Sequence, residues 1–239
     1  MTQGSTAANS LYLSAPVNAI VEGIYEEHIP FSEIKRHGDF GLGTFDLLDG
    51  EMVMLDGRVW QMRADGCVSE VGDEAQTPFA CVTFYRPQQQ AVLNTEMEYA
   101  AFLAWLQAPL PSANIFYAFR IEGEFAYMKV RSVPKSECYI PLVEIAREQP
   151  VFEFENIRGT LAGFYTPDFM AAVSVPGMHL HFLSDDLAHG GHLLACRPRR
   201  VSVGVQALHT VELALPTTSY YLNWDFSRDV REDLDKAER

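Results

Sequence analysis

The chain has 239 residues, of which 48% are hydrophobic and 21% are charged, a composition typical of a folded globular protein and not of a disordered one. Its formal net charge of −14 at pH 7 disfavours DNA, RNA and anionic lipid as partners, and only residues 197–200 form a short basic run. The same charge repels a carboxylate substrate, so an enzyme for such a substrate needs a local positive group, such as a buried arginine or a metal ion.

Residues 1–16 are uncharged and rich in Ser, Thr and Ala, which indicates a flexible N-terminal tail. The first Lys or Arg is Lys35, so the basic region of a secretory signal is missing. No apolar stretch reaches the roughly 18 residues that a membrane helix requires. The cysteines show no CxxC pairing and lie in apolar or strand-like segments, which favours reduced core thiols in the cytoplasm. They are Cys67, Cys81, Cys138 and Cys196.

The first half of the chain predicts a sheet with helices beside it. Apolar spacing favours helices at residues 18–25, 30–37 and 94–106, the last with Asn94 as its N-cap. From Gly41 onward the apolar period is two, and two Asp-Gly turns indicate a β-meander. The strands predicted in this half are 44–48, 52–55, 58–62, 81–85, 115–121 and 125–133, the last two forming a hairpin around residues 122–124.

The second half is nearly all strand and turn. Its predicted strands are 152–157, 160–165, 179–183, 192–196, 200–205 and 210–215. The polar segment 147–150 is a candidate joint between the halves, although a continuous mixed sheet also fits. We therefore predict a mixed α/β fold of the α+β type. It would have an N-terminal sheet-and-helix domain at 17–150 and a C-terminal β-barrel or sandwich at 151–239 that carries a metal site.

Three histidines close together in the second half indicate that metal site. His179 and His181 stand at i and i+2, which on a strand places both imidazoles on one face. The chain can reverse over residues 184–191, so that His192 faces the same pair and completes three neutral nitrogen ligands with an open fourth position. Such a set suits one divalent ion per chain, zinc first, as a Lewis acid for a chelating oxygen substrate.

Other interpretations remain open on this pattern alone. A single histidine is more often an ordinary strand or loop residue, and His189 competes with His192 for the third position. A cupin also carries His-x-His on a strand, followed by a Glu, but here Asp185 or Asp186 occupies about that place. The alternatives are a non-catalytic cupin-like module that binds a metal or a sugar, and another zinc-dependent lyase or hydrolase.

Several segments, in order from Asn18 to the C-terminus, resemble the α-acetolactate decarboxylases. They are HGDFGLGTF at 37–45, LDGE at 48–51, VRSVP at 130–134, GTLAGFY at 159–165 and GMHLHF at 177–182, followed by GGH at 190–192. Separate motifs in one order are far more specific than His-x-His alone. The resemblance implies decarboxylation of 2-acetolactate (2-hydroxy-2-methyl-3-oxobutanoate), a 2-hydroxy-3-keto acid, to acetoin and CO₂ in acetoin and butanediol biosynthesis. It also implies a homodimer.

The resemblance further implies which residues form the site. It implies zinc bound by His179, His181 and His192 and catalytic roles for Glu51, Arg131 and a glutamate near the C-terminus, best matched by Glu238. Alternatives for that glutamate are Glu232, Asp233 and Asp235.

These residues suit the reaction. The hydroxyl and ketone oxygens of the substrate would chelate zinc, which would stabilise the enediolate that remains after CO₂ is lost, so no organic cofactor is needed. Arg131 would hold the carboxylate by paired hydrogen bonds, and a glutamate would deliver the proton. Taken alone, Glu51 could be a solvated turn residue and Arg131 a surface ion-pair partner. Thr44 could bind substrate or simply favour its strand.

Overall fold

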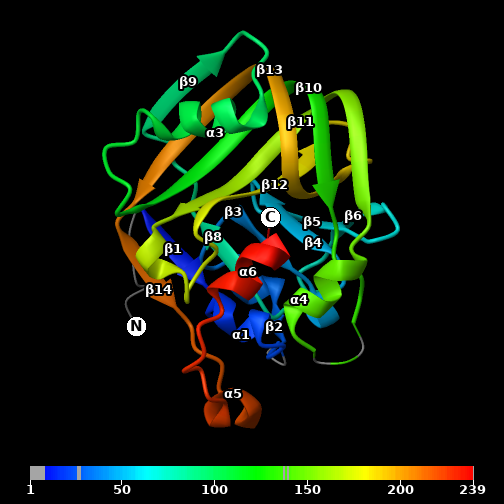
Figure 1. The fold of residues 1–239 in the computed structure, drawn as a ribbon, viewed down its shortest axis with the longest axis vertical. Helices are drawn as coiled ribbons and strands as arrows, with labels where there is room; N and C mark the ends of the chain where they lie inside the picture. Colours follow the sequence, from blue (N-terminus) through cyan, green and yellow to red (C-terminus); the bar gives the residue numbers. More distant parts are fainter. Residues whose placement is uncertain (1–8, 26–27, 137, 139, 239) are drawn as a thin grey trace.

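The computed structural model describes residues 9–25, 28–136, 138 and 140–238, and within them the strands form two main sheets (Figure 1). The first is a mixed sheet of seven strands. In spatial order they are β14 (Thr210–Leu213), β1 (Ser10–Leu13), β8 (Ala80–Thr83), β3 (Phe40–Thr44), β4 (Glu51–Leu55), β5 (Arg58–Met62) and β6 (Val68–Val71). A short pair, β2 (Ile29–Pro30) and β7 (Gln76–Thr77), lies beside it.

The second sheet has five strands in the described part of the chain. In spatial order they are β10 (Phe116–Arg131), β11 (Val151–Thr166), β12 (Gly177–Ser184), β13 (Gly190–Leu208) and β9 (Gln89–Leu93). Because β10 also pairs with β13, four of these strands close into a small barrel. The predicted strand-rich α+β fold is thus confirmed, and the barrel contains β10 from the first half of the chain as well as strands of the second half.

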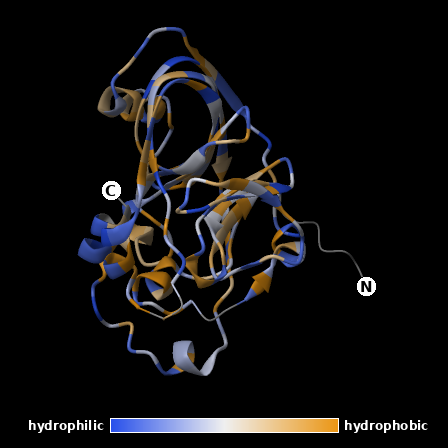
Figure 2. Cartoon of the chain, turned by 90° about the vertical axis from the view of Figure 1, so that its right-hand side faces the viewer, coloured by the Kyte–Doolittle hydropathy of each residue, from blue (hydrophilic) through white to orange (hydrophobic). Residues whose placement is uncertain are grey.

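Short helices cover the sheets. They are α1 (Val17–Val21), α2 (Phe31–Ile34), α3 (Tyr99–Gln107), α4 (Leu142–Ile145), α5 (Ser219–Asn223) and α6 (Arg231–Glu238), with 3₁₀ turns at Asp46–Leu48, Ala146–Glu148 and Asp168–Met170. Helices α1, α4 and α6 pack together, and α3 lies on β13 (Figure 1). Helix α6 is mostly hydrophilic (Figure 2), yet Leu234 and Ala237 on its inner side are each 1% exposed. None of the described helices is long and apolar enough to cross a membrane.

The predicted hairpin around residues 122–124 is wrong, because β10 continues through Gly123 without reversing. Gly123 has φ +149°, and it pairs with Gly159 on one side and Val201 on the other. A Cβ there would lie 2.1 Å from the carbonyl oxygen of Arg200, so glycine is required by close packing in a bent strand. Likewise 152–157 and 160–165 join in β11, and 192–196 and 200–205 join in β13.

The predicted strand at 44–48 is also displaced. The strand is β3, which ends at Thr44, and Leu47 and Leu48 have φ values of 57° and 55° that end any extended structure. All five residues of β3 are buried, so the alternation expected of a half-buried strand is missing there. Helix α3 starts at Tyr99 with Glu98 as N-cap, and Asn94 follows strand β9 instead of capping a helix.

Part of the expected flexible tail is an inner strand. Strand β1 pairs with β14 on one side and β8 on the other, and Leu11 and Leu13 are fully buried, whereas residues 1–8 of that tail lie outside the described residues. The sheets also do not divide at residue 150, because β10 belongs to the barrel and β14 to the seven-stranded sheet. All four cysteines are free. Cys81 and Cys196 are buried as expected of core thiols, but Cys67 and Cys138 are exposed.

Candidate metal centre and substrate cavity

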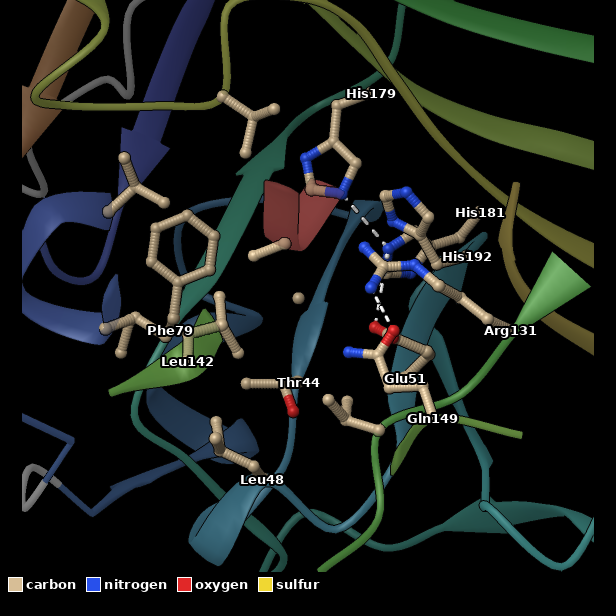
Figure 3. A pocket seen from close by; sticks show the side chains of 16 residues that line it. Thr44, Leu48, Glu51, Phe79, Arg131, Leu142, Gln149, His179, His181 and His192 are labelled. Carbon is tan, nitrogen blue, oxygen red and sulfur yellow. Dashed lines mark hydrogen bonds and ion pairs between the residues drawn. The ribbon is translucent and has the colours of Figure 1, made fainter. Parts of the chain in front are cut away.

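Three imidazoles converge where β12 and β13 pair. His181 on β12 stands directly opposite His192 on β13, so both side chains leave the same face, and His179 joins them two residues earlier (Figure 3). Ligand atoms of the three histidines lie within 4.8 Å of one another, and the Nε2 atoms of His179 and His181 are 3.2 Å apart. Tetrahedral zinc with Zn–N bonds of about 2.0–2.1 Å places its ligand nitrogens about 3.3 Å apart. The spacing of His179 and His181 therefore fits such an ion, and His192 lies close enough to join them.

The protonation of His179 and His181 also suits metal binding. Nδ1 of His181 donates to the carbonyl oxygen of Met52 at 2.9 Å, which leaves the lone pair on the Nε2 that faces the other imidazoles. Burial, aided by the positive charge of Arg131, lowers the pKa of His179 to about 3. Burial first, and then the neighbouring His179, holds the pKa of His181 well below its usual value. Neutral imidazole is the form that binds a metal ion.

A guanidinium and a carboxylate stand beside the histidines. Arg131 is the last residue of β10 and pairs with His192, and it is only 7% exposed. Its Nη1 donates to Oε1 of Gln149 (Figure 3). Glu51 opens β4, is also 7% exposed, and its Oε2 lies 3.6 Å from Nε2 of His181. A guanidinium, a carboxyl group and three imidazoles thus face one space.

That space is a cavity with a polar side and an apolar side. The apolar side is formed by residues of α1, α4, α6 and the loops between strands: Val17, Ile20, Leu48, Phe79, Val133, Leu142, Val175 and Ala237. In Figure 3, Phe79 and Leu142 stand across the cavity from Arg131 and Glu51. Apolar walls of this kind exclude water and strengthen the electrostatic interactions of a bound anion.

The structure brings most of the residues expected in the site together. His179, His181, His192, Glu51, Arg131 and Thr44 all line the cavity. The Thr44 hydroxyl, however, donates to the carbonyl oxygen of Gly50 at 2.7 Å, so its proton holds the turn before β4 and only its lone pairs remain for a ligand.

Among the described side chains, the candidates for the C-terminal acidic residue of the site are not seen in the cavity. The Glu238 side chain lies outside the described residues, as does that of Asp235, although the backbone of Glu238 ends α6 and its neighbour Ala237 lines the cavity. Glu232 and Asp233 form ion pairs with Lys236 and Arg228 at 2.7 and 2.6 Å.

His189 is not part of the histidine cluster found among the described residues. Its ring packs against Phe154 with centroids 4.5 Å apart, and its carbonyl oxygen accepts from the amide of Ser184 in the turn between β12 and β13. The geometry therefore favours His192 as the third ligand.

Sequence reasoning missed Gln149 and the apolar wall. The polarity of residues 147–150 indicates only a joint between the halves, and nothing in the local pattern links Gln149 to Arg131, which lies 18 positions earlier. Val17, Ile20 and Leu142 have the apolar spacing of ordinary core residues. A cavity wall and a filled core have the same pattern, because both are apolar surfaces turned away from solvent.

The chain is thus a strand-rich protein with a three-histidine centre able to hold a metal ion, and this centre lines a cavity that also contains Arg131. A family model described as alpha-acetolactate decarboxylase matches residues 11–228. The chain belongs to the α-acetolactate decarboxylase family, and it is accordingly an enzyme of the carboxy-lyase class.

Individual relatives agree with this assignment over nearly the whole chain. An α-acetolactate decarboxylase of Methanosarcina mazei is 38% identical over 236 residues, which cover 98% of this chain and 82% of the relative. One of Methylococcus capsulatus is 39% identical and covers 96% and 89%. The crystal structure of α-acetolactate decarboxylase from Bacillus subtilis strain 168 superposes with a TM-score of 0.93 at 33% identity, covering 96% of this chain and 99% of that one.

Proposed function

We propose that this chain converts 2-acetolactate to acetoin and CO₂ with one divalent ion, zinc first, held by His179, His181 and His192. The observation that carries the proposal is the convergence of three imidazoles, one guanidinium and one carboxyl group on a single cavity. When bound there, the ion supplies Lewis-acid stabilisation for the negative charge that develops on the substrate oxygens as CO₂ leaves.

Arg131 binds the carboxylate that becomes CO₂. Its guanidinium offers a planar fork of donors that matches a carboxylate, and the site buries it at 7% exposure. This positive charge also overcomes, at short range, the repulsion expected from a net charge of −14. The apolar wall opposite accommodates the two methyl groups of acetolactate, because those groups gain by leaving water.

Glu51 holds and delivers the proton that replaces the carboxylate. Its carboxyl group is buried and lies within 3.6 Å of His181, so it is next to the reacting atoms of a ligand bound at the histidines. A proton delivered from one fixed side yields one enantiomer of acetoin, whereas bulk water would not discriminate between faces. Glu238 is the alternative donor, since it ends the helix whose Ala237 lines the cavity.

The direct test uses racemic acetolactate and the metal-loaded protein without an organic cofactor. Acetoin and CO₂ should form, chelation should abolish turnover, and zinc should restore it. Turnover that resists chelation would contradict a role for the metal. Release of diacetyl in place of acetoin would indicate only spontaneous oxidative decay of the substrate.

The cellular setting is part of the same proposal. We infer a cytoplasmic enzyme of acetoin and butanediol formation, supported by the four free cysteines and by the family. A homodimer is the expected assembly, and light scattering of the purified protein tests it: a mass near 26.8 kDa would contradict a dimer.

A further inference from the structure

The side chain of Gln149 lines the cavity next to Arg131. Its Oε1 accepts a hydrogen bond from Nη1 of Arg131. A guanidinium has only donors, so the oxygen of the amide must face it and the amide nitrogen must face away. Figure 3 shows this nitrogen directed into the cavity, toward the side where Thr44 lies. Among the described residues, none accepts a hydrogen bond from it.

The backbone around Gln149 is fixed to the strand that carries Arg131. The amide of Ser132 donates to the carbonyl oxygen of Pro150 at 3.3 Å, and the hydroxyl of Ser132, itself fully buried, donates to the carbonyl oxygen of Met62 at 2.6 Å. The residues that follow Arg131 and Gln149 are thus joined to each other and to the seven-stranded sheet. These hydrogen bonds hold the backbones of Arg131 and Gln149 next to each other, which favours the contact between their side chains.

An amide is the side chain best suited to this place. Arginine has a long, rotatable side chain. One hydrogen bond that it donates to an amide oxygen fixes the plane of its guanidinium before substrate binds. A glutamate in the same place would make the same contact but would neutralise the positive charge of Arg131 and repel a carboxylate. An amide fixes the fork, keeps the charge and still has two N–H donors facing the cavity.

We propose that Gln149 is a substrate-binding and positioning residue: it orients the guanidinium of Arg131 and donates its own N–H to the carboxylate of the bound 2-hydroxy-3-keto acid. This inference rests on the proposed function of the cavity. Gln149 and Arg131 together recognise the carboxylate, which the product acetoin lacks. Loss of Gln149 should therefore weaken binding of the acid and leave binding of the neutral product unchanged.

The experiment compares Gln149→Met, which keeps length but cannot hydrogen-bond, with Gln149→Glu and with the control Gln107→Met at an exposed position of α3. Each metal-loaded variant is assayed for kcat and KM with acetolactate and for inhibition by acetoin. Binding of 2-hydroxy-2-methylpropanoate, an acid that has no ketone, is measured by calorimetry. Metal content and melting temperature are recorded alongside.

We expect Gln149→Met to lower kcat/KM about 10- to 100-fold, mainly through KM, as for a lost hydrogen bond to a charged group. The acid should bind correspondingly more weakly, while the inhibition constant of acetoin stays within about twofold. Gln149→Glu should weaken binding of the acid further, and Gln107→Met should bind the acid as the wild type does.

Two results would overturn the role of Gln149. One is unchanged binding of the acid; the other is an equal loss of affinity for the acid and for acetoin, which would indicate general damage to the cavity. If the wild type makes no acetoin, the proposed function fails instead. The calorimetric comparison of acid with acetoin then still decides whether Gln149 recognises a carboxylate.

Discussion

The two sheets contribute to the cavity in different ways. The barrel supplies Arg131 and all three histidines from neighbouring strands, in a register that pairs His192 with both His181 and Arg131. The seven-stranded sheet supplies Glu51, and it reaches the histidines through the hydrogen bond between Met52 and His181. The metal ligands therefore depend on local strand pairing, whereas the carboxylate depends on how two sheets pack. Changes at the three histidines of the barrel should remove the metal, whereas changes at Arg131 and at Glu51 should spare it.

The largest effect is expected from His192→Ala, which removes one ligand from the barrel. Metal content should fall from about one ion per chain to near zero at micromolar zinc, and activity should fall by at least about 10³-fold, since the site keeps only two ligands. Elemental analysis and an acetoin assay measure both. His189→Ala is the matched control, because it lies in the same turn region yet packs against Phe154. Loss of metal in the control and not in His192→Ala would reverse the assignment.

Arg131→Ala should separate metal binding from chemistry within the barrel. We expect the ion to stay and kcat/KM to fall by about 10²- to 10⁴-fold, as a buried charge-assisted contact to the reacting carboxylate disappears. Arg131→Lys should restore little, because an ammonium lacks the fork of two parallel donors. Metal content and steady-state kinetics provide the measurement. A nearly wild-type Arg131→Lys would mean that only charge matters at this position.

Glu51→Gln tests the contribution of the other sheet. The amide keeps the shape of the side chain but cannot supply a proton, so we expect full metal content, a rate lower by about 10- to 10³-fold and acetoin of reduced enantiomeric purity. Chiral chromatography of the product measures the enantiomeric purity directly. If rate and enantiomeric purity are both unchanged, Glu51 is not the proton donor and Glu238 becomes the better candidate.

The smallest effect concerns the metal-free protein at low pH. Burial lowers the pKa of His179 to about 3, below its unfolded value of about 6.5, so the unfolded state binds more protons between these values. The stability contributed by the neutral imidazole is complete above pH 6.5 and is lost as the pH falls toward 3. Urea unfolding with chelator should show a loss of about 1–2 kcal/mol from His179 between pH 6.5 and 5.

His179→Asn should remove part of this pH dependence, whereas substitution of His209, which is exposed, should not. An identical pH dependence in the wild type and His179→Asn would mean that the imidazole is not held neutral by burial.

Much of the candidate site could be predicted from local pattern. The i, i+2 spacing of His179 and His181 and a short reversal to His192 are enough to bring three imidazoles together, because a strand alternates faces and a tight turn pairs neighbours. The meander strands β4 and β5 followed from the same period of two and from the Asp-Gly turns. Glu51 and Arg131 were indicated by motifs that occur in the same order in the α-acetolactate decarboxylases, and not by their spacing.

The features that could be predicted without the structure have causes that lie within a few residues: the strand-rich composition, the two-residue period, the turns and the histidine pair. Long-range packing makes β10 run through Gly123 and pairs β1 with β14, about 200 positions away. It also brings Gln149 to Arg131 and lets the Met52 carbonyl orient His181. These contacts join segments far apart in the chain. Their partners are chosen by the packing of whole sheets, which no local pattern encodes.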